Sequence, residues 1–460
     1  MEKTRELSGL DLHTFSRDVV IKMAIIFVGA LDEELLKKSL NDVITNHYPI
    51  FGSRLKSKSG GLFDYAIPAE FDENNRPFEW LTKDKSAQSI SVDFDIRKLF
   101  LTSSNNAMAI PIQMSGLNDY SRLFTVQETS HKSYLNKNRS MVSIYCSKYS
   151  DYTAFLFAAS HMLCDGHGLR LLLTAWEDAL HGRPVTPIQT DYVVPPSQII
   201  GSELCPIQPL STWQMIRIAA NVGWQILRNG KAVPKRLSFS LEFIESLRKK
   251  CQQMTKLPIS KYDILCAIAT KLSAVGRTGR DFDKMVVGTV ANIRNRVAGN
   301  ENYPHNFVMV ICDTLSSNEI SKMTFLELVV RLKSYSSKFT KGPNELLSMF
   351  NLMEKNKPQP CAPYPFDFAL GVTHWGNFRF QSLDFSVAAC DKNIDGAGLV
   401  KVFEPFMEIS LITNVCVVLF DDGLLGSGRA ILNLALFKSH WAKAEKELGG
   451  IENYLKRLIS

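Results

Sequence analysis

Residues 153–170 read TAFLFAASHMLCDGHGLR, and this stretch decides how the chain is interpreted. An apolar run ends in His161, Asp165 and Gly166 come four residues later, and apolar residues with helical spacing follow. We therefore expect a buried strand that delivers the histidine to a tight turn at the start of a helix. Because histidine titrates near neutral pH, a histidine held in this way can accept a proton from a hydroxyl or an amine.

Length and composition indicate a large globular protein of two domains. The chain has 460 residues, of which 45% are hydrophobic and 22% are charged, and this is long for one domain. The formal net charge of +7 is spread along the chain, so no nucleic-acid-binding tail is expected. The small positive excess still favours an anionic small molecule as a ligand.

Cysteine usage and the apolar runs indicate the compartment. The nine cysteines show neither CxxC pairs nor zinc-site spacing, and their odd number argues against a disulfide framework, so we expect a reducing compartment and no metal. The first residues, MEKTRELSGLDL, are charged where a signal peptide is apolar. The apolar runs at 23–31 and 409–420 fall far short of the about 20 residues of a membrane span. We therefore expect a cytoplasmic protein without a membrane span.

The order of the predicted elements favours an α/β fold with mixed sheets. A proline-rich stretch separates two halves, so we predict an N-terminal domain at 1–185, a connector at 186–230 and a C-terminal domain at 231–460. Strands and helices alternate irregularly, which argues against a doubly wound sheet. The expected strands are 19–28, 48–55, 141–146, 153–160, 285–291, 306–312, 366–373, 400–403, 409–420 and 429–436. The expected helices are 32–46, one after the glycine turn with Trp176 on its apolar face, 241–253, 260–272, 325–339, 344–353 and 439–458.

The stretch from His161 to Gly166 fits HxxxDG, the signature of the chloramphenicol-acetyltransferase-like acyltransferases. Its neighbours make the match more specific, because they resemble segments of the BAHD acyltransferases in the same order along the chain. These neighbours are LSGLDL at 7–12, HYPIFGSRL at 47–55, WEDALHGRP at 176–184, ISKYDILCAIATKLSA at 259–274, ANIRNRVAGNENYPHNF at 291–307 and THWGNFRFQSLDF at 373–385. The resemblance therefore covers most of the chain.

Two departures mark the chain as similar to a divergent member of that family. The family's DFGWG motif survives only as Asp384 and Phe385, followed by SVA at 386–388. The position of the family's YFGN motif reads YPHN at 303–306.

The resemblance implies roles for the HxxxDG residues. His161 would be the general base, although a lone histidine is more often a core residue with satisfied nitrogens. Asp165 would not be the third member of a catalytic triad but a structural residue that pairs with an arginine and fixes the turn. Gly166 would keep the pantetheine path clear, because it projects no side chain.

The resemblance also implies roles for residues in the second half. Thr373 and Trp375 would donate hydrogen bonds to the oxyanion, although a tryptophan beside a strand end is more often a core residue. His374, between them, should face the opposite side of the strand. Asp384 would pair with an arginine, for which Arg294 is the candidate and Arg296 the fallback.

The resemblance implies two chloramphenicol-acetyltransferase-like domains with an active-site tunnel at their interface. The implied activity is the transfer of an acyl group from acyl-CoA to a hydroxyl or amine of a small molecule, typical of secondary metabolism. Acyl-CoA would be a co-substrate, no cofactor would be bound permanently, and the protein would be a monomer.

Two alternatives remain open at this point. One is a carrier-protein-dependent condensation enzyme that forms amides, although such enzymes usually carry a second histidine where this chain has Ser160. The other is a catalytically silent binding protein of the same fold, which the eroded DFGWG motif suggests.

Overall fold

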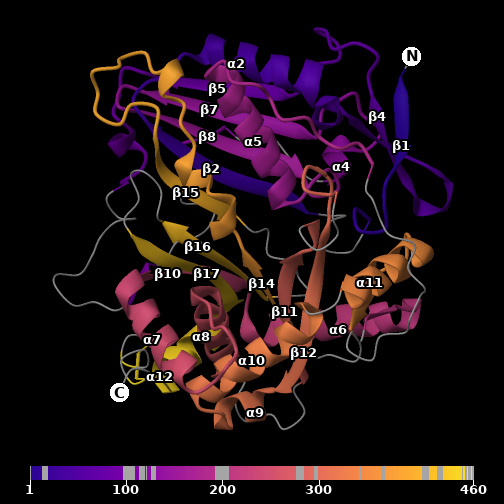
Figure 1. The fold of residues 1–460 in the computed structure, drawn as a ribbon, viewed down its shortest axis with the longest axis vertical. Helices are drawn as coiled ribbons and strands as arrows, with labels where there is room; N and C mark the ends of the chain where they lie inside the picture. The colour runs from indigo at the N-terminus through magenta and orange to yellow at the C-terminus, as the bar shows by residue number, and fades with distance from the viewer. Residues whose placement is uncertain are drawn as a thin grey trace.

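The computed structural model has two halves, each built around one sheet (Figure 1). The structure describes residues 2–12, 19–96, 109–112, 120, 122–125, 131–191, 207–275, 284–294, 299–340, 343–363, 368–406, 414–421, 428–447, 449–450, 453 and 457. In the view of Figure 1 the upper half holds mostly N-terminal strands and the lower half mostly C-terminal ones. The two-domain α/β fold with mixed sheets, expected from the sequence, is confirmed.

The upper half contains a five-stranded sheet of order β15-β2-β8-β7-β5. Only the edge pair β5 and β7 is parallel, so the sheet is mixed. Apolar side chains fill both faces of its central strands, which explains their unbroken apolar runs. The bounds are β2 (Val20–Val28), β5 (Glu79–Lys85), β7 (Val142–Tyr149), β8 (Tyr152–Ser160) and β15 (Val400–Phe406). The predicted hairpin of β7 and β8 is confirmed.

Two long helices, one short helix and a small sheet complete the described part of the upper half. Asp32 caps α2 (Glu33–Asp42) by accepting hydrogen bonds from two backbone N–H groups, and α2 packs against α5 (Gly166–Leu180). The Trp176 indole N–H lies 3.1 Å from the Leu36 carbonyl oxygen, which ties α5 to α2. The smaller elements are β1 (Lys3–Glu6), β3 (Arg54–Ser57), β4 (Phe63–Ile67) and α4 (His131–Tyr134).

One predicted strand of this half is wrong. Residues 48–55 do not form a strand throughout, because Pro49–Gly52 make a 3-10 turn before β3 begins. The Phe51 N–H donates to the Tyr48 carbonyl oxygen at 3.0 Å. The apolar residues Ile50 and Phe51 are buried, but they reach the core from a turn rather than from a sheet.

The lower half contains a seven-stranded sheet of order β12-β11-β14-β16-β17-β10-β6. The pairs β11–β14 and β14–β16 are parallel and the others are antiparallel. The strand bounds are β6 (Ala109–Ile112), β10 (Ala232–Ser240), β11 (Lys284–Asn292), β12 (Val308–Ser316), β14 (Phe368–His374), β16 (Asn414–Asp421) and β17 (Arg429–Phe437).

Helices cover one face of this sheet, with α8 packed on its central strands (Figure 1). The helix bounds are α7 (Leu241–Gln253), α8 (Lys261–Val275), α9 (Ser317–Lys322), α10 (Phe325–Thr340), α11 (Pro343–Asn356) and α12 (Lys438–Glu447). The helices predicted at 241–253, 260–272, 325–339 and 344–353 are confirmed. Parts of the strand predicted at 409–420 and of the helix predicted at 439–458 lie outside the described residues.

Each sheet takes an edge strand from the other half of the chain. β15 comes from the C-terminal half but pairs with β2, while β6 comes from the N-terminal half and pairs with β10. Side chains on β16 also alternate between the two cores, with Cys416 and Val418 in the lower core and Val417 and Leu419 in the upper core. The sheets therefore do not follow the predicted boundaries of the two domains.

The predicted connector contains structure that its composition does not show. An 18-residue helix, α6 (Thr212–Asn229), starts at a capping box formed by Ser211 and Gln214 and ends before Gly230. A short strand, β9 (Ile207–Pro209), precedes it and pairs with β13 (Cys361–Pro363). None of the helices in the described ranges is long and apolar enough to cross a membrane.

A buried ion pair joins the two sheets. Arg236 on β10 pairs with Glu404 on β15, and both side chains are almost fully buried. The Asn433 amide donates to the same carboxylate at 2.7 Å. β15 belongs to the C-terminal half of the chain but lies in the upper sheet. The ion pair therefore fixes the position of β15 relative to the lower sheet.

We predict that Glu404→Gln lowers the free energy of unfolding by about 3–5 kcal/mol, because it leaves the Arg236 charge buried without its partner. Urea denaturation measures the change. Glu2→Gln is the matched control, because its partner Lys56 and Glu2 itself are exposed, and an exposed pair contributes about 1 kcal/mol or less. An Arg236→Met/Glu404→Leu double variant should recover most of the loss. Equal losses in Glu404→Gln and Glu2→Gln would contradict the prediction.

Candidate active site

His161 follows the last residue of β8 and opens the turn that leads into α5. Its backbone N–H donates to the Val19 carbonyl oxygen at 2.9 Å, which continues the pairing of β8 with β2 by one residue. The Leu163 N–H then donates to the Ser160 carbonyl oxygen at 3.0 Å and closes the turn. The predicted arrangement of strand, histidine turn and helix is confirmed.

The Asp165 carboxylate fixes this turn as the N-cap of α5. It accepts hydrogen bonds from the backbone N–H groups of His167 and Gly168, both at 3.0 Å. It also accepts one at 3.1 Å from the N–H of Phe307, in the other half of the chain. The carboxylate is therefore bound from both halves of the molecule.

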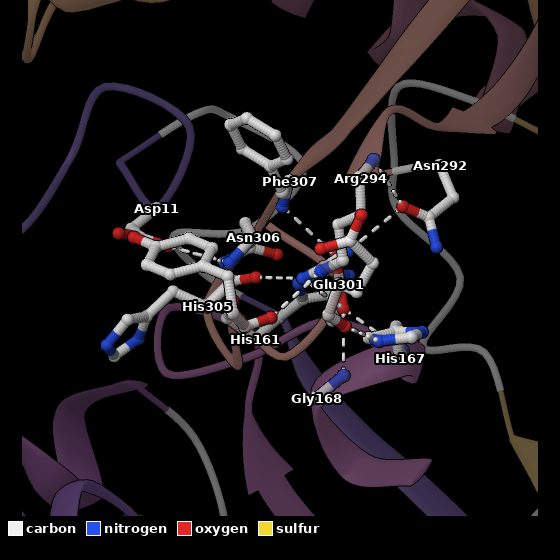
Figure 2. A network of polar contacts seen from close by, with 12 residues as sticks. Asp11, His161, His167, Gly168, Asn292, Arg294, Glu301, His305, Asn306 and Phe307 are labelled. Carbon is white, nitrogen blue, oxygen red and sulfur yellow. Dashed lines mark hydrogen bonds and ion pairs between the residues drawn. The ribbon is translucent and has the colours of Figure 1, made fainter. Parts of the chain in front are cut away.

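Arg294 is the charged partner of Asp165. Its Nη1 and Nη2 atoms lie 2.9 and 3.1 Å from the two carboxylate oxygens, so the pair is bidentate. The remaining guanidinium donors bind the carbonyl oxygens of Tyr303 and His305 and the Asn292 side chain (Figure 2). Arg294 is fully buried with these partners. The sequence left the arginine partner of Asp165 unassigned, and the structure identifies it.

The predicted pairing of Asp384 with Arg294 is therefore wrong. The Asp384 carboxylate accepts a hydrogen bond from the Ser386 N–H at 2.8 Å and lies 3.8 Å from the His181 ring. The Asp384 carboxylate is partly exposed, so it does not need a buried cationic partner. The fallback Arg296 lies outside the described residues. The order of motifs along the chain could not show which aspartate the arginine reaches.

The charge of Asp165 is stabilised in spite of its burial. Burial alone would raise the pKa of this carboxyl, but the Arg294 guanidinium outweighs burial and lowers the pKa below its ordinary value. Asp165 therefore remains a carboxylate at neutral pH and serves as the anchor of the turn. Its side chain faces Arg294 and the helix start, as expected for a structural role.

Asn306 holds His161 from the other side of the turn, and the sequence assigned it no role. Its side-chain amide donates to the His161 carbonyl oxygen at 2.7 Å and to Asp11 Oδ1 at 2.8 Å (Figure 2). Asp11 also accepts from the Ser8 hydroxyl at 2.7 Å. The LSGLDL and YPHN segments, noted only as resemblances, thus meet at the histidine.

Two titratable groups beside this contact have strongly shifted pKa values. Burial raises the pKa of Asp11 to about 6. Burial also lowers the pKa of His305 to about 3, so this ring is neutral. His305 stacks on Tyr65 with ring centroids 4.7 Å apart, and its Nδ1 lies 2.7 Å from the Leu163 carbonyl oxygen. His305 is therefore a packed part of the turn's surroundings.

The His161 imidazole is suited to accept a proton. Burial lowers its pKa below the ordinary value, so the ring is neutral at neutral pH. Its Nδ1 is buried without a hydrogen-bond partner among the described residues, as are His305 Nε2 and Asn306 Oδ1. Buried polar atoms are rarely left unpaired, and those that are unpaired often mark a functional site.

Phe378 lies against the glycine of the motif. A Cβ atom on Gly166 would come within 2.5 Å of the Phe378 ring. The prediction that Gly166 leaves an open path is therefore wrong for this conformation, because an aromatic ring from the loop after β14 fills the space. The glycine instead permits close packing of that loop on the start of α5.

Thr373 and Trp375 lie where β14 ends. Leu370 and Val372 face the lower core, so Thr373 points to the opposite face of the sheet. The Trp375 ring is buried in the upper core against Phe378, 5.7 Å away between centroids. Trp375 thus lies in the core, which was the alternative to an oxyanion role. An oxyanion role for Thr373 or Trp375 remains a prediction. His374 packs on Tyr262 of α8, as expected for a residue on the other face.

A polar pocket of about 250 Å³ lies beside Asp11, between the two halves. Arg5, Asp11 and Tyr65 line it from the N-terminal half, and Tyr303 and Lys357 from the C-terminal half. Because Asp11 contacts Asn306, the pocket borders the residues that hold His161.

Comparison with solved structures identifies the fold. The structure of Fusarium sporotrichioides TRI101 with coenzyme A and T-2 covers 99% of this chain and 98% of its own, with a TM-score of 0.69 and 13% sequence identity. TRI101 is a BAHD acyltransferase. The chain has the BAHD acyltransferase fold. The resemblance read from the sequence is thereby confirmed at the level of the fold.

Sequence comparison finds curated relatives at low identity. No protein-family model matches the chain. The acetyltransferase pyiB of Pyricularia grisea is 20% identical over 259 residues, which are 54% of this chain and about half, 50%, of that protein. The acetyltransferase adrJ of Penicillium roqueforti is 22% identical over 406 residues, which are 81% of this chain and 79% of that protein.

We predict that Asp165→Asn lowers the free energy of unfolding by about 3–5 kcal/mol, because it leaves the buried Arg294 charge unpaired. The amide NH2 group also faces backbone N–H groups that donate to the carboxylate in the parent, so two donors meet and a hydrogen bond is lost. Asp384→Asn is the matched control and should change stability by about 1 kcal/mol or less, since that carboxylate is partly exposed. Urea denaturation of both variants measures the difference, and matching midpoints would contradict the prediction.

Proposed function

We propose that this protein transfers an acyl group from acyl-CoA to a hydroxyl or amine of a small-molecule acceptor. The single observation that carries the proposal is a neutral, partly buried His161, fixed by both halves of a fold shared with TRI101, whose structure contains coenzyme A and T-2. The acetyltransferase names of the two curated relatives agree with it. Acyl-CoA is then a co-substrate.

The proposed reaction proceeds in a ternary complex. The acceptor oxygen or nitrogen attacks the thioester carbonyl carbon, and His161 takes the acceptor's proton. The C–S bond of the tetrahedral intermediate then breaks, and the leaving thiolate takes the proton from the imidazolium. The products are the acylated acceptor and free CoA. No covalent acyl-enzyme forms, so the protein contributes orientation and a base.

The surroundings of His161 support this role. Asn306 holds the histidine's backbone carbonyl and Asp165 holds the turn, so neither is the proton acceptor. Since Nδ1 is shielded, Nε2 is the nitrogen we assign as the base. Thr373, on the face of β14 away from α8, is the proposed donor to the oxyanion.

The substrate entrance is assigned to the boundary between the halves. The pocket beside Asp11 has walls from both halves, and its cations Arg5 and Lys357 are paired with carboxylates that also line it. Binding sites between domains are common for small ligands. A tunnel through this boundary remains part of the proposal.

We predict that His161→Ala lowers kcat/KM by about 10²–10⁴-fold, the usual contribution of a general base. Thiol release from acetyl-CoA with a panel of alcohols and amines measures it. His167→Ala is the control, because that ring contacts the Glu301 carbonyl oxygen and no part of the proposed base. A folded His161→Ala protein with full activity would refute the mechanism. Failure of the parent to bind CoA in calorimetry would favour a silent binding protein.

The pH profile of kcat/KM gives a second prediction. Because burial lowers the pKa of His161, the base form persists below pH 6.5, and activity should fall only at more acid pH. Asp11, with a pKa raised to about 6, titrates nearby, so the profile of Asp11→Asn separates the two groups. A parent profile that is still rising above pH 7 would contradict a depressed pKa.

A further inference from the structure

Helix α6 carries an exposed apolar stripe along its outer face. Trp213, Ile216, Trp224 and Leu227 are 72%, 53%, 59% and 83% exposed. Their successive spacings of three, eight and three place them on one side of the helix, with the small residues Ala220 and Gly223 between Ile216 and Trp224. The opposite side of α6 is the buried one, with Ile218 and Gln225. The apolar stripe is therefore a second apolar face of α6, separate from the face that packs on the protein.

This stripe is unusual within the molecule. The chain has six tryptophans, and two of them, Trp213 and Trp224, are strongly exposed on this one helix. The other four are buried or half-buried. Exposed apolar side chains scattered singly need no explanation, but a contiguous patch with two aromatic anchors indicates an interaction surface.

The charged residues of the segment that carries the stripe are all positive. The sequence from 204 to 241 contains no Asp or Glu. Arg228, Lys231 and Lys438 are exposed at the C-terminal end of α6, where the Lys438 N–H donates to the Lys231 carbonyl oxygen at 3.2 Å. None of these three has an ion pair within the described part of the chain. The stripe thus ends in a basic cluster.

We propose that α6 docks on an anionic phospholipid membrane surface, with the tryptophans in the interface and the basic cluster on lipid headgroups. A helix with an apolar stripe, aromatic residues and flanking cations is typical of interfacial helices that lie in the plane of the membrane. Tryptophan favours this region because its ring is apolar and its N–H is polar. With 18 residues, α6 lies on the bilayer and does not cross it.

Charge favours a lipid surface over a second copy of this chain. The segment from 204 to 241 of a second copy holds no acidic residue that could pair with the basic cluster, whereas anionic headgroups neutralise it. The docking face is separate from the pocket beside Asp11, so the proposal stands independently of the proposed catalytic role.

The test is sedimentation of the full chain with vesicles of phosphatidylcholine alone or mixed with phosphatidylserine. The parent should bind the mixed vesicles, more weakly as salt is raised. Trp224→Glu/Leu227→Glu should abolish binding. Arg228→Ala/Lys231→Ala should weaken it about 25-fold, at roughly fivefold for each cation. Met254→Glu, which alters another exposed apolar residue outside the stripe, is the control and should bind as the parent does.

Two results for the parent would overturn the proposal. One is a parent that does not bind the mixed vesicles although it is folded by circular dichroism. The other is a parent that is dimeric by light scattering and becomes monomeric with Trp224→Glu/Leu227→Glu, which would assign the stripe to a second copy. A stripe variant that stays folded and still sediments with the vesicles would also place the membrane contact elsewhere.

Discussion

The rest of the site depends on the buried pair of Asp165 and Arg294. The carboxylate caps α5 in one half of the molecule and receives the guanidinium and the Phe307 N–H from the other half. A buried ion pair gains little over apolar packing, but its geometry is specific, and loss of one partner is costly. We therefore interpret the pair as a device that fixes the relative position of the two halves at the histidine turn.

Contacts around His161 follow the same principle. The turn is pressed so closely on residues 303–306 that a Cβ on Gly168 would lie 1.9 Å from the Pro304 carbonyl oxygen. Asn306 reaches from that segment to the His161 carbonyl and to Asp11. The imidazole is thus positioned by three segments that are far apart in the sequence. Its pKa is set by burial among them, so position and protonation state have one origin.

The local pattern of apolar and capping residues predicted most helices and strands correctly. It failed where the local conformation depends on tertiary packing. The apolar run before His161 predicted β8, and Asp165 followed by Gly166 predicted the start of α5. Residues 48–55 have the same apolar character, yet Pro49 begins a turn there. Helix α6 was not predicted, because a proline-rich stretch precedes it and several of its apolar residues lie on an exposed face.

The sequence by itself determined the fold class and the arrangement of strand, histidine turn and helix, because these depend on periodicity, capping and the order of motifs. Only the tertiary structure decided that Arg294 serves Asp165 rather than Asp384, and that Phe378 fills the space at Gly166. It alone brought Asn306 and Asp11 to His161. The physical reason is that such contacts join residues of different strands and loops, whose distances are set by how the two sheets pack and not by their spacing along the chain.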